Sequence, residues 1–290
     1  MKVCWVALIG RPNVGKSTLM NQIIKYDLSI VSPVAQTTRD QIYGIYTDDE
    51  YQIIFIDTPG FHKPISKFGE QLNKQAQAAV KESDLVLFLN PINQEISSGD
   101  QLIIEKLVDK ANKIAIITKD DLAQNGALDL TQRYEKLKEL GFKEIVNINY
   151  KNQTKIDDLL MKIKTYAYEE QQFFDDDFIT DKSELFLTKE LIRNSAIKFL
   201  SDELPHSIFI EITEYDIKPY KRSIKAIIYC KKESQKGIII GKKGAMIKQI
   251  GTEARRQIIQ KFQTNVYLEL KVKVEKNWTN SINQIKKMSF

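Results

Sequence analysis

The segment GRPNVGKS, residues 10 to 17, lies between a short apolar run and an amphipathic pattern typical of a helix. It matches G-x-x-x-x-G-K-[ST], in which two glycines adopt backbone conformations closed to other residues and successive N–H groups turn inward around a phosphate. The positive end of the following helix favours the same anion. The alternative is a glycine-rich strand-to-helix turn with a chance lysine, but it leaves the matching strand, spacing and helix unexplained. The segment therefore predicts a phosphate-binding loop, or P-loop, in an α/β domain.

The P-loop motif also assigns roles to individual side chains. Lys16 is expected to reach the outer phosphates, and the Ser17 hydroxyl is expected to take one position on a magnesium ion. The residues of this segment predicted to bind nucleotide are Gly10, Arg11, Pro12, Asn13, Val14, Gly15, Lys16, Ser17 and Thr18.

Short apolar runs alternate with longer amphipathic stretches through residues 1–172. We expect strands at 3–9, 41–46, 51–56, 85–90, 113–118 and 144–148. Between most of them we expect helices at 16–26, 68–82, 100–110, 128–140 and 156–170. Alternation of this kind is typical of parallel strands joined by crossover helices, whereas the two consecutive strands around residues 48–50 indicate a hairpin. The fold class is therefore α/β, with a mostly parallel six-stranded sheet and one antiparallel edge strand.

The pattern changes after FFDDDFITDK, residues 173–182, which we interpret as an interdomain linker. Beyond it the order indicates a smaller α+β domain, with a helix at 184–200, strands at 207–214 and 223–231, helices across 234–262 and a strand at 266–274. The predicted division is a P-loop domain at 1–172, a linker at 173–182, and a second domain with a C-terminal tail at 183–290.

Two further segments indicate a nucleotide-dependent switch. DTPG, residues 57–60, ends the second hairpin strand, so that Asp57 is expected beside the P-loop, where it holds magnesium through water, and Gly60 is expected to offer its N–H to the terminal phosphate. Thr58 and Pro59 are assigned to the same nucleotide site. AQTTRD, residues 35–40, places Thr38 in the long loop after the first helix, where it can complete the magnesium shell only with a third phosphate present.

A third segment, TKDD at residues 118–121, indicates guanine as the base. GTPases generally use N-K-x-D here, and the carboxylate accepts hydrogen bonds from N1–H and the 2-amino group, a pattern that adenine does not present. Asp121 fits that role, and the aliphatic stem of Lys119 can cover the base. Thr118 replaces the usual asparagine, so one tethering hydrogen bond is expected to be weaker or rearranged.

The second domain carries an uneven positive charge. Residues 218–276 contain 16 Lys and Arg against 4 Asp and Glu, although the net charge of the whole chain is only +5. Within them, GKKG at 241–244 is a G-x-x-G loop between two helical segments, which lets the backbone approach a nucleic acid closely. The positive charge by itself could also belong to a solvated lysine-rich surface. Arg255 and Arg256 either touch phosphates or form ion pairs on the surface. The predicted RNA-binding residues are Ile240, Gly241, Lys242, Lys243, Gly244, Lys248, Arg255 and Arg256.

Together these motifs resemble the Era family of ribosome-associated GTPases, and further matching segments are DELPHSI at 202–208 and IIIGKKGAMIKQIGTEAR at 238–255. The resemblance implies a Ras-like GTPase domain followed by a type II KH domain, with GTP or GDP and Mg²⁺ bound. It implies binding near the 3′ end of 16S ribosomal RNA and assistance to 30S subunit maturation, by a cytoplasmic monomer that also contacts the inner face of the cell membrane peripherally. The family's Ser-Ala motif falls at Asn149 and Tyr150, which do not match it, so the backbone contact to guanine O6 is left open.

The hydrolytic residues are predicted to be Lys16, Thr38 and Gly60. Phe61 stands where many switch GTPases carry a water-orienting glutamine, so we expect intrinsic turnover on the order of 10⁻³ per second or below. Asn13 is a candidate K⁺ ligand because related potassium-stimulated GTPases carry asparagine there, and a turn residue without an ion is the alternative.

Two other classes compete with this reading. A P-loop enzyme acting on a small substrate predicts no RNA requirement, and a membrane-surface or protein-binding GTPase would turn the basic face toward another partner. No stretch of the chain approaches the roughly 20 apolar residues of a membrane helix. We also expect GTP to order residues 30–40 and 58–81 and so to bias the orientation of the KH domain.

Overall fold

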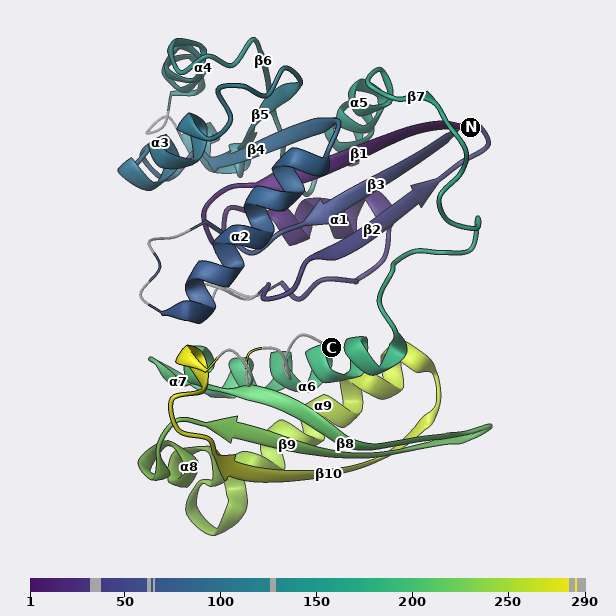
Figure 1. The fold of residues 1–290 in the computed structure, drawn as a ribbon, viewed down its shortest axis with the longest axis vertical. Helices are drawn as coiled ribbons and strands as arrows, with labels where there is room; N and C mark the ends of the chain where they lie inside the picture. Colours follow the sequence, from purple (N-terminus) through teal and green to yellow (C-terminus); the bar gives the residue numbers. More distant parts are fainter. Residues whose placement is uncertain (32–37, 62–63, 65, 126–128, 282–284, 286–290) are drawn as a thin grey trace. The chain divides into compact units, whose positions relative to one another are not determined.

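The computed structural model describes residues 1–31, 38–61, 64, 66–125, 129–281 and 285. It divides into two compact units (Figure 1). The first comprises Met1–Ile65 and Gly69–Asp181, and the second comprises Ser66–Phe68 and Lys182–Phe290. Each unit has a sheet and a buried core of its own, and each is described by itself below. Among the described residues, no helix combines the length and the apolar character needed to cross a bilayer.

The first unit is built on a mostly parallel sheet, and the predicted α/β fold class is confirmed (Figure 1). The strand order is β2 (Ile42–Thr47), β3 (Tyr51–Asp57), β1 (Lys2–Ile9), β4 (Leu85–Pro91), β5 (Lys113–Thr118) and β6 (Glu144–Asn147). All neighbours in this order pair in parallel except β2 and β3, which form the predicted antiparallel hairpin. Asp48 closes the hairpin turn, because its carboxylate accepts hydrogen bonds from the backbone N–H groups of Glu50 and Tyr51.

Helices cover both faces of this sheet, as expected for parallel strands joined by crossovers. They are α1 (Lys16–Ile24), α2 (Lys67–Glu82), α3 (Ser98–Glu105), α4 (Leu130–Glu139) and α5 (Gln153–Lys164), with a 3₁₀ turn η1 (Asp120–Asn125). Side chains of α2, α3 and α4 join one core cluster with inward-facing strand residues such as Ala7 and Ile9. Figure 1 shows α1 on the opposite face from α2. Strand alternation places Val6 and Leu8 toward that second face, and both are fully buried.

One predicted helix is wrong at its C-terminal end. The pattern at 156–170 predicts a single helix, but α5 ends at Lys164, and β7 (Tyr168–Glu169) pairs antiparallel with Lys2 and Val3 of β1. The reason is an open edge, since β4 pairs with β1 only from Val6 onward and the first residues of β1 lack a neighbour on that side. The chain therefore turns back to fill this edge, and within the described part of the chain the sheet has seven strands rather than the predicted six.

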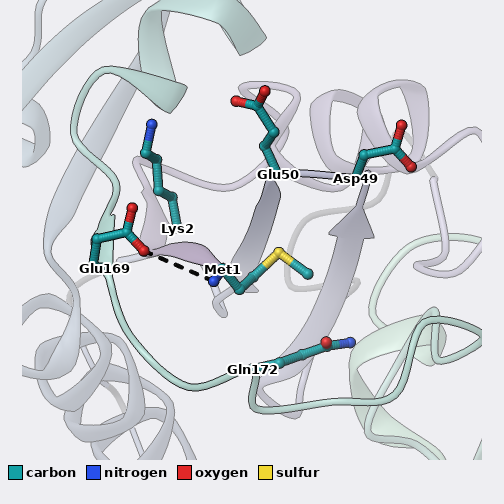
Figure 2. A pocket seen from close by; sticks show the side chains of 6 residues that line it. All are labelled: Met1, Lys2, Asp49, Glu50, Glu169 and Gln172. Carbon is teal, nitrogen blue, oxygen red and sulfur yellow. Dashed lines mark ion pairs between the residues drawn. The ribbon is translucent and has the colours of Figure 1, made fainter.

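A surface pocket of about 520 Å³ opens beside this added strand (Figure 2). The terminal ammonium group of Met1 lies 3.8 Å from a carboxylate oxygen of Glu169, and the rim is completed by Lys2, Asp49, Glu50 and Gln172. This pocket lies at the amino end of β1. The loops that carry the predicted phosphate and base chemistry lie at the carboxyl ends of the strands, so the pocket is separate from them.

Residues 173–181, which fall within the predicted linker, run from Trp5 and Gln52 to the outer edge of β2, and we call them the β2 strap. The side-chain nitrogen of Gln52 donates to the Phe174 carbonyl at 2.8 Å, and its side-chain oxygen accepts from the Phe174 N–H at 3.1 Å. Farther along, the Ile45 N–H donates to the Ile179 carbonyl at 2.8 Å. A β-bridge also joins Gly44 to Thr180. The strap is thus attached to the first unit through backbone hydrogen bonds.

The second unit has a three-stranded sheet with helices on one face (Figure 1). Its elements in chain order are α6 (Glu184–Phe199), α7 (Leu204–Ser207), β8 (Phe209–Lys218), β9 (Lys221–Cys230), α8 (Glu233–Ile240), the 3₁₀ turn η2 (Lys242–Gly244), α9 (Ala245–Phe262), β10 (Asn265–Val274) and η3 (Trp278–Asn280). Strand β9 is central, antiparallel to β8 and parallel to β10. Apolar side chains of α6, α8 and α9 pack against the sheet in one core cluster.

Trp278 belongs to the packing of this second unit. Its ring is fully buried, its indole N–H donates to the Ser207 carbonyl at 3.0 Å, and it meets Phe209 edge to face at 5.3 Å. Trp278 therefore anchors the segment after β10 instead of presenting a stacking surface.

Candidate functional site

Four loops with predicted chemistry meet at one edge of the first sheet. They follow β1, β3, β5 and β6, which are mutually parallel, so their carboxyl ends lie on the same side. In open α/β sheets, ligands bind in the crevice outside these ends. The P-loop, DTPG, TKDD and the pair Asn149-Tyr150 are thereby brought together from segments far apart in the sequence.

The P-loop connects β1 to α1 in the predicted way. Gly15 is the residue before the helix, with φ 105°, and Asn13 is left-handed with φ 64°. Val14 is fully buried, Asn13 is exposed, and Arg11 turns away to pair with the buried carboxylate of Asp100 at 2.8 Å. The loop is therefore anchored by the buried Val14 side chain, while Asn13 remains exposed.

The three predicted metal ligands gather beside the P-loop. Ser17 Oγ donates to Asp57 Oδ2 at 2.6 Å, and the Thr38 hydroxyl lies 3.1 Å from Ser17 Oγ and 3.5 Å from the same carboxylate oxygen. Asp57 is fully buried, and burial raises its pKa against the opposing effects of the Ser17 hydrogen bond and the Lys16 charge. Its second oxygen, Oδ1, is buried and has no hydrogen-bond partner among the described residues.

An unsatisfied buried carboxylate oxygen beside two hydroxyls is a donor set that suits Mg²⁺, which prefers oxygen ligands together with water and substrate phosphates. The residues present therefore fit a magnesium ion, which Ser17, Thr38 and Asp57 would hold.

Lys16 lies beside this group with its ammonium turned onto the P-loop backbone. Nζ donates to the carbonyl oxygens of Gly10 at 3.2 Å and Arg11 at 3.0 Å. Burial lowers the pKa of Lys16 to about 8, and the charge of Asp57 opposes that shift. Among the described residues this buried cation contacts two carbonyls and lies near one carboxylate, which makes it a ready partner for a phosphate anion.

DTPG packs directly against the P-loop. The Thr58 hydroxyl donates to the Leu8 carbonyl at 2.8 Å, and a Cβ atom on Gly60 would lie 2.6 Å from the Pro12 backbone nitrogen. The next residue, Phe61, is buried in the core cluster, with the Lys106 ammonium 5.2 Å from its ring centre. Phe61 is thus turned into the core, and its ring has no group that could orient water.

The TKDD loop contributes two buried residues, Thr118 and Asp120, and two partly exposed ones, Lys119 and Asp121. Thr118 is fully buried and donates its hydroxyl to the Val14 carbonyl at 2.9 Å. Lys119 adopts a left-handed backbone with φ 59°, and Asp121 is partly exposed, 3.7 Å from the Lys151 ammonium. The neighbouring Asp120 is buried against Asn147 and Lys155, so Asp121 is the carboxylate of this loop that remains accessible.

Tyr150 is a residue of this site that the sequence did not identify. Its hydroxyl donates to the Gly15 carbonyl at 2.9 Å, and a Cβ atom on Gly15 would lie only 2.1 Å from that hydroxyl oxygen. The sequence signal was the mismatch at positions 149–150, which was interpreted only as leaving the backbone contact to guanine O6 open.

In the second unit, the GKKG loop has a backbone that requires its glycines. Gly241 has φ 71° and ψ 170°, a region open essentially to glycine alone, and a Cβ there would lie 2.7 Å from the Met246 Cβ. Gly244 has φ 78° with open space around it, and Lys243 between them has φ 50°. Lys242 and Lys243 are exposed at the tip. The loop therefore presents two cations on a tightly turned backbone.

A groove of about 350 Å³ lies next to this loop, between α9 and β10. Lys248 and Arg255 supply its cations, and apolar walls come from Ile247, Leu268 and Leu270, with Gly251 and Thr252 completing it. Arg256 does not line the groove; it pairs with Glu253 at 2.8 Å and helps to hold the pKa of that carboxyl well below its usual range. Ile240 packs against the core cluster of the unit.

Comparison with known proteins matches each of the two units to a protein family model. A family model described as a 50S ribosome-binding GTPase matches residues 5–119, and a KH domain model matches residues 203–279. The protein named GTPase Era of Mycoplasmopsis agalactiae is 52% identical, with all of both chains covered. GTPase Era of Clostridium kluyveri is 42% identical, covering 100% of this chain and 99% of its own.

Two solved structures share the whole architecture. One is described as Era in complex with MgGDPNP and nucleotides 1506-1542 of 16S ribosomal RNA, with a TM-score of 0.92 and 33% identity over 99% of this chain and 98% of that one. The other is a point variant of Aquifex aeolicus Era bound to GDP.AlF4⁻, with a TM-score of 0.92 and 34% identity over 99% of each chain.

Proposed function

Because the chain belongs to the Era family of GTPases, we propose that it is a nucleotide-controlled switch that binds 16S ribosomal RNA near its 3′ end and assists 30S subunit assembly and maturation. The observation that carries this proposal is the convergence of Ser17, Thr38 and Asp57 beside Lys16. The RNA part draws on the GKKG loop with its adjoining basic groove, and on the relative that was solved with a 16S fragment.

The nucleotide site is proposed to work mainly by positioning and charge. The P-loop residues 10–18 hold the phosphates, Lys16 meets their negative charge, and Gly60 offers its N–H to the last phosphate. A magnesium ion, once bound, supplies further neutralisation of the phosphate charge. Thr38 is proposed to complete the magnesium shell only with a third phosphate present, which makes it the sensor of nucleotide state. Thr58 and Pro59 set the course of the loop that carries Gly60.

The base is proposed to be read by the TKDD loop. The accessible carboxylate of Asp121 accepts from guanine, and the stem of Lys119 covers the ring. Thr118 serves the loop rather than the base, since its hydroxyl is bonded to the Val14 carbonyl. Slow intrinsic turnover follows from the buried position of Phe61, which leaves the attacking water without a side chain to orient it there.

The RNA site is proposed to be the GKKG loop together with the groove between α9 and β10. Gly241 and Gly244 allow the RNA backbone to approach, and Lys242 and Lys243 contact phosphates. Lys248 and Arg255 line the groove in which bases would lie. The proposed division of labour follows the predicted domains, with 1–172 binding nucleotide and 183–290 binding RNA. The contacts of the β2 strap argue that most of the stretch at 173–182 moves with the first part.

The switch is tested by measuring the affinity for a short unpaired 16S 3′-end RNA with GTP analogue or GDP bound. Wild-type protein should show an affinity that depends on the nucleotide. Lys16→Ala should bind the same RNA with an affinity indifferent to added GTP, while the thermal unfolding of its KH domain is unchanged. An RNA affinity in Lys16→Ala that still responds to GTP would contradict the proposed coupling.

A potassium ion is proposed as an additional cofactor, with Asn13 as its ligand. Asn13 is exposed in the P-loop, in a left-handed conformation that a turn residue would also adopt. Steady-state GTP hydrolysis rates in potassium chloride and in sodium chloride distinguish a potassium ligand from a turn residue without an ion. Equal rates would contradict a potassium site at Asn13.

The protein is further proposed to act as a monomer in the cytoplasm, with a peripheral contact at the inner membrane face. A GTPase whose basic face meets anionic lipid is the competing function. If the KH domain binds RNA, the unpaired RNA should compete for the basic face better than heparin or anionic vesicles at equal salt. Sedimentation velocity measures the oligomeric state in the same samples.

A further inference from the structure

Two carbonyl groups of the P-loop backbone each accept a hydrogen bond from a side-chain hydroxyl of another loop. Thr118, at the end of β5, donates to the Val14 carbonyl at 2.9 Å, and Tyr150, after β6, donates to the Gly15 carbonyl at 2.9 Å. The Gly15 oxygen also accepts the first backbone bond of α1, from Leu19 at 2.9 Å. Two consecutive peptide groups are therefore fixed, one by the TKDD loop that is proposed to recognise guanine and one by the loop after β6.

Fixing these carbonyls also sets the direction of two N–H groups. In a planar trans peptide the C=O and the following N–H point in opposite directions. A bond to the Val14 oxygen therefore directs the Gly15 N–H away from Thr118, and a bond to the Gly15 oxygen directs the Lys16 N–H away from Tyr150. Successive N–H groups of this loop are the ones that surround a phosphate.

The identities of the two hydroxyl residues are complementary. Thr118 has a short side chain and Tyr150 a long one, and their hydroxyls reach the carbonyl groups of neighbouring residues. The Tyr150 hydroxyl fits because Gly15 has no side chain, since a Cβ atom would lie 2.1 Å from it. Burial raises the pKa of Tyr150, which keeps the hydroxyl protonated as a donor.

We propose that Tyr150 is a positioning residue which, together with Thr118, holds the Val14–Gly15–Lys16 backbone in its phosphate-binding form and so couples the TKDD loop and the loop after β6 to the phosphate cradle. This inference rests on the proposed nucleotide site and deepens it. The competing reading is that Tyr150 only fills space beneath the P-loop. The two readings differ in what the hydroxyl alone contributes, because phenylalanine preserves the ring.

The test is the dissociation rate of a fluorescent GDP from the full-length protein with Mg²⁺ present. Tyr150→Phe should release GDP roughly threefold to tenfold faster, the change expected for the loss of one hydrogen bond. Its kcat for GTP should stay within about twofold of wild type while KM rises. Tyr166→Phe is the matched control, because it also removes a hydroxyl bond in the first unit, to Glu144 at 2.6 Å, away from the P-loop. It should release GDP at the wild-type rate.

Variants of Thr118 test the second hydroxyl and the coupling. Thr118→Val, which keeps the shape, should also speed GDP release, and Thr118→Ser, which keeps the hydroxyl, should restore the slow rate. The double variant Tyr150→Phe with Thr118→Val should depart from the sum of the single effects, because both bonds act on neighbouring peptides.

The possible outcomes distinguish a failure of the Tyr150 positioning role from a failure of the proposed nucleotide site. If wild-type protein retains GDP and Tyr150→Phe releases it no faster than Tyr166→Phe, the positioning role is overturned and the nucleotide site stands. If wild-type protein shows no preference for guanine nucleotides, the proposed site and this inference are overturned together.

Discussion

Ser17 Oγ and Asp57 Oδ2 lie 2.6 Å apart although 40 positions separate the two residues in the chain. The contact exists because β1 and β3 are adjacent and parallel, so that the start of α1 and the end of β3 reach the same corner of the sheet. The other Asp57 oxygen is buried without a partner among the described residues. A buried, half-satisfied carboxylate beside a hydroxyl is a costly arrangement that a cation would relieve.

Asp57→Asn should therefore weaken the dependence of nucleotide binding on magnesium. The amide is neutral and contributes less to a divalent cation, so GTP affinity in the presence of Mg²⁺ should fall about tenfold to hundredfold, while the affinity in EDTA changes little. Titration of a fluorescent GTP analogue with and without Mg²⁺ measures both. Asp84→Asn, which removes a charge bonded to the Trp5 N–H at 2.8 Å, serves as the control. A wild-type affinity that ignores Mg²⁺ would contradict the assignment.

Lys16 should make the stability of the nucleotide-free protein depend on pH. An unfolded lysine titrates near 10.5, whereas burial lowers the pKa of Lys16 in the native state to about 8. Between these values the unfolded state binds more protons, so stability rises with pH from about 8 to about 10.5. Lys16→Met lacks this contribution, and it should exceed wild type at pH 7 by an amount on the order of 3 kcal/mol that shrinks toward pH 10. Urea unfolding of both proteins across this range measures the difference, and a constant difference would refute the buried charge.

The two glycines of the GKKG loop should differ in their response to alanine. Gly244→Ala meets open space and carries only the left-handed backbone cost of about 1–2 kcal/mol. Gly241→Ala adds a contact at 2.7 Å with Met246 and a backbone region almost reserved for glycine, so about 2–5 kcal/mol is expected. Unfolding followed by Trp278 fluorescence in a Trp5→Phe background measures both. Equal losses would mean that the loop does not hold this backbone.

Lys242 and Lys243 should set part of the salt dependence of RNA binding. Each phosphate contact to single-stranded nucleic acid contributes about 0.7 to the slope of log affinity against log salt. Replacing both lysines by alanine should make that slope shallower by about 1.4 and weaken binding similarly for all sequences. The control pair is Lys225 and Lys271, which are ion-paired with Glu214 and Glu269 on the sheet. If the control pair lowers the slope as much, the loop is not the phosphate contact.

The sequence was most informative where one short segment carries both the chemistry and the local structure. GRPNVGKS required a strand before it and a helix after it, and β1 and α1 flank it as expected. The helix predicted at 100–110 was shifted toward the C-terminus, because the true start is set by the Ser97–Asp100 capping box, a hydrogen-bond pair without apolar periodicity. Strand β7 was missed because two residues give no periodic signal and their pairing partner lies at the other end of the domain.

The contact made by Tyr150 is likewise one that a local sequence pattern does not reveal. Its bond to Gly15 spans 135 positions, so no local pattern announces it. The sequence signal was the departures at 118 and at 149–150, and the convergence of Thr118 and Tyr150 on the P-loop becomes visible only when the ends of β5 and β6 are seen side by side. The roles of the predicted nucleotide and RNA residues stay predictions until the measurements above are made.

The β2 strap also determines where the chain can be cut. Strand β2 is the last strand on its side of the sheet, and the hydrogen bonds from residues 179 and 180 occupy positions on its outer edge that another strand could otherwise pair with. A fragment ending at residue 172 would leave that edge bare and open to edge-to-edge association between copies. A fragment that ends at Asp181 keeps its own cover, so an isolated GTPase domain should be defined to include the strap.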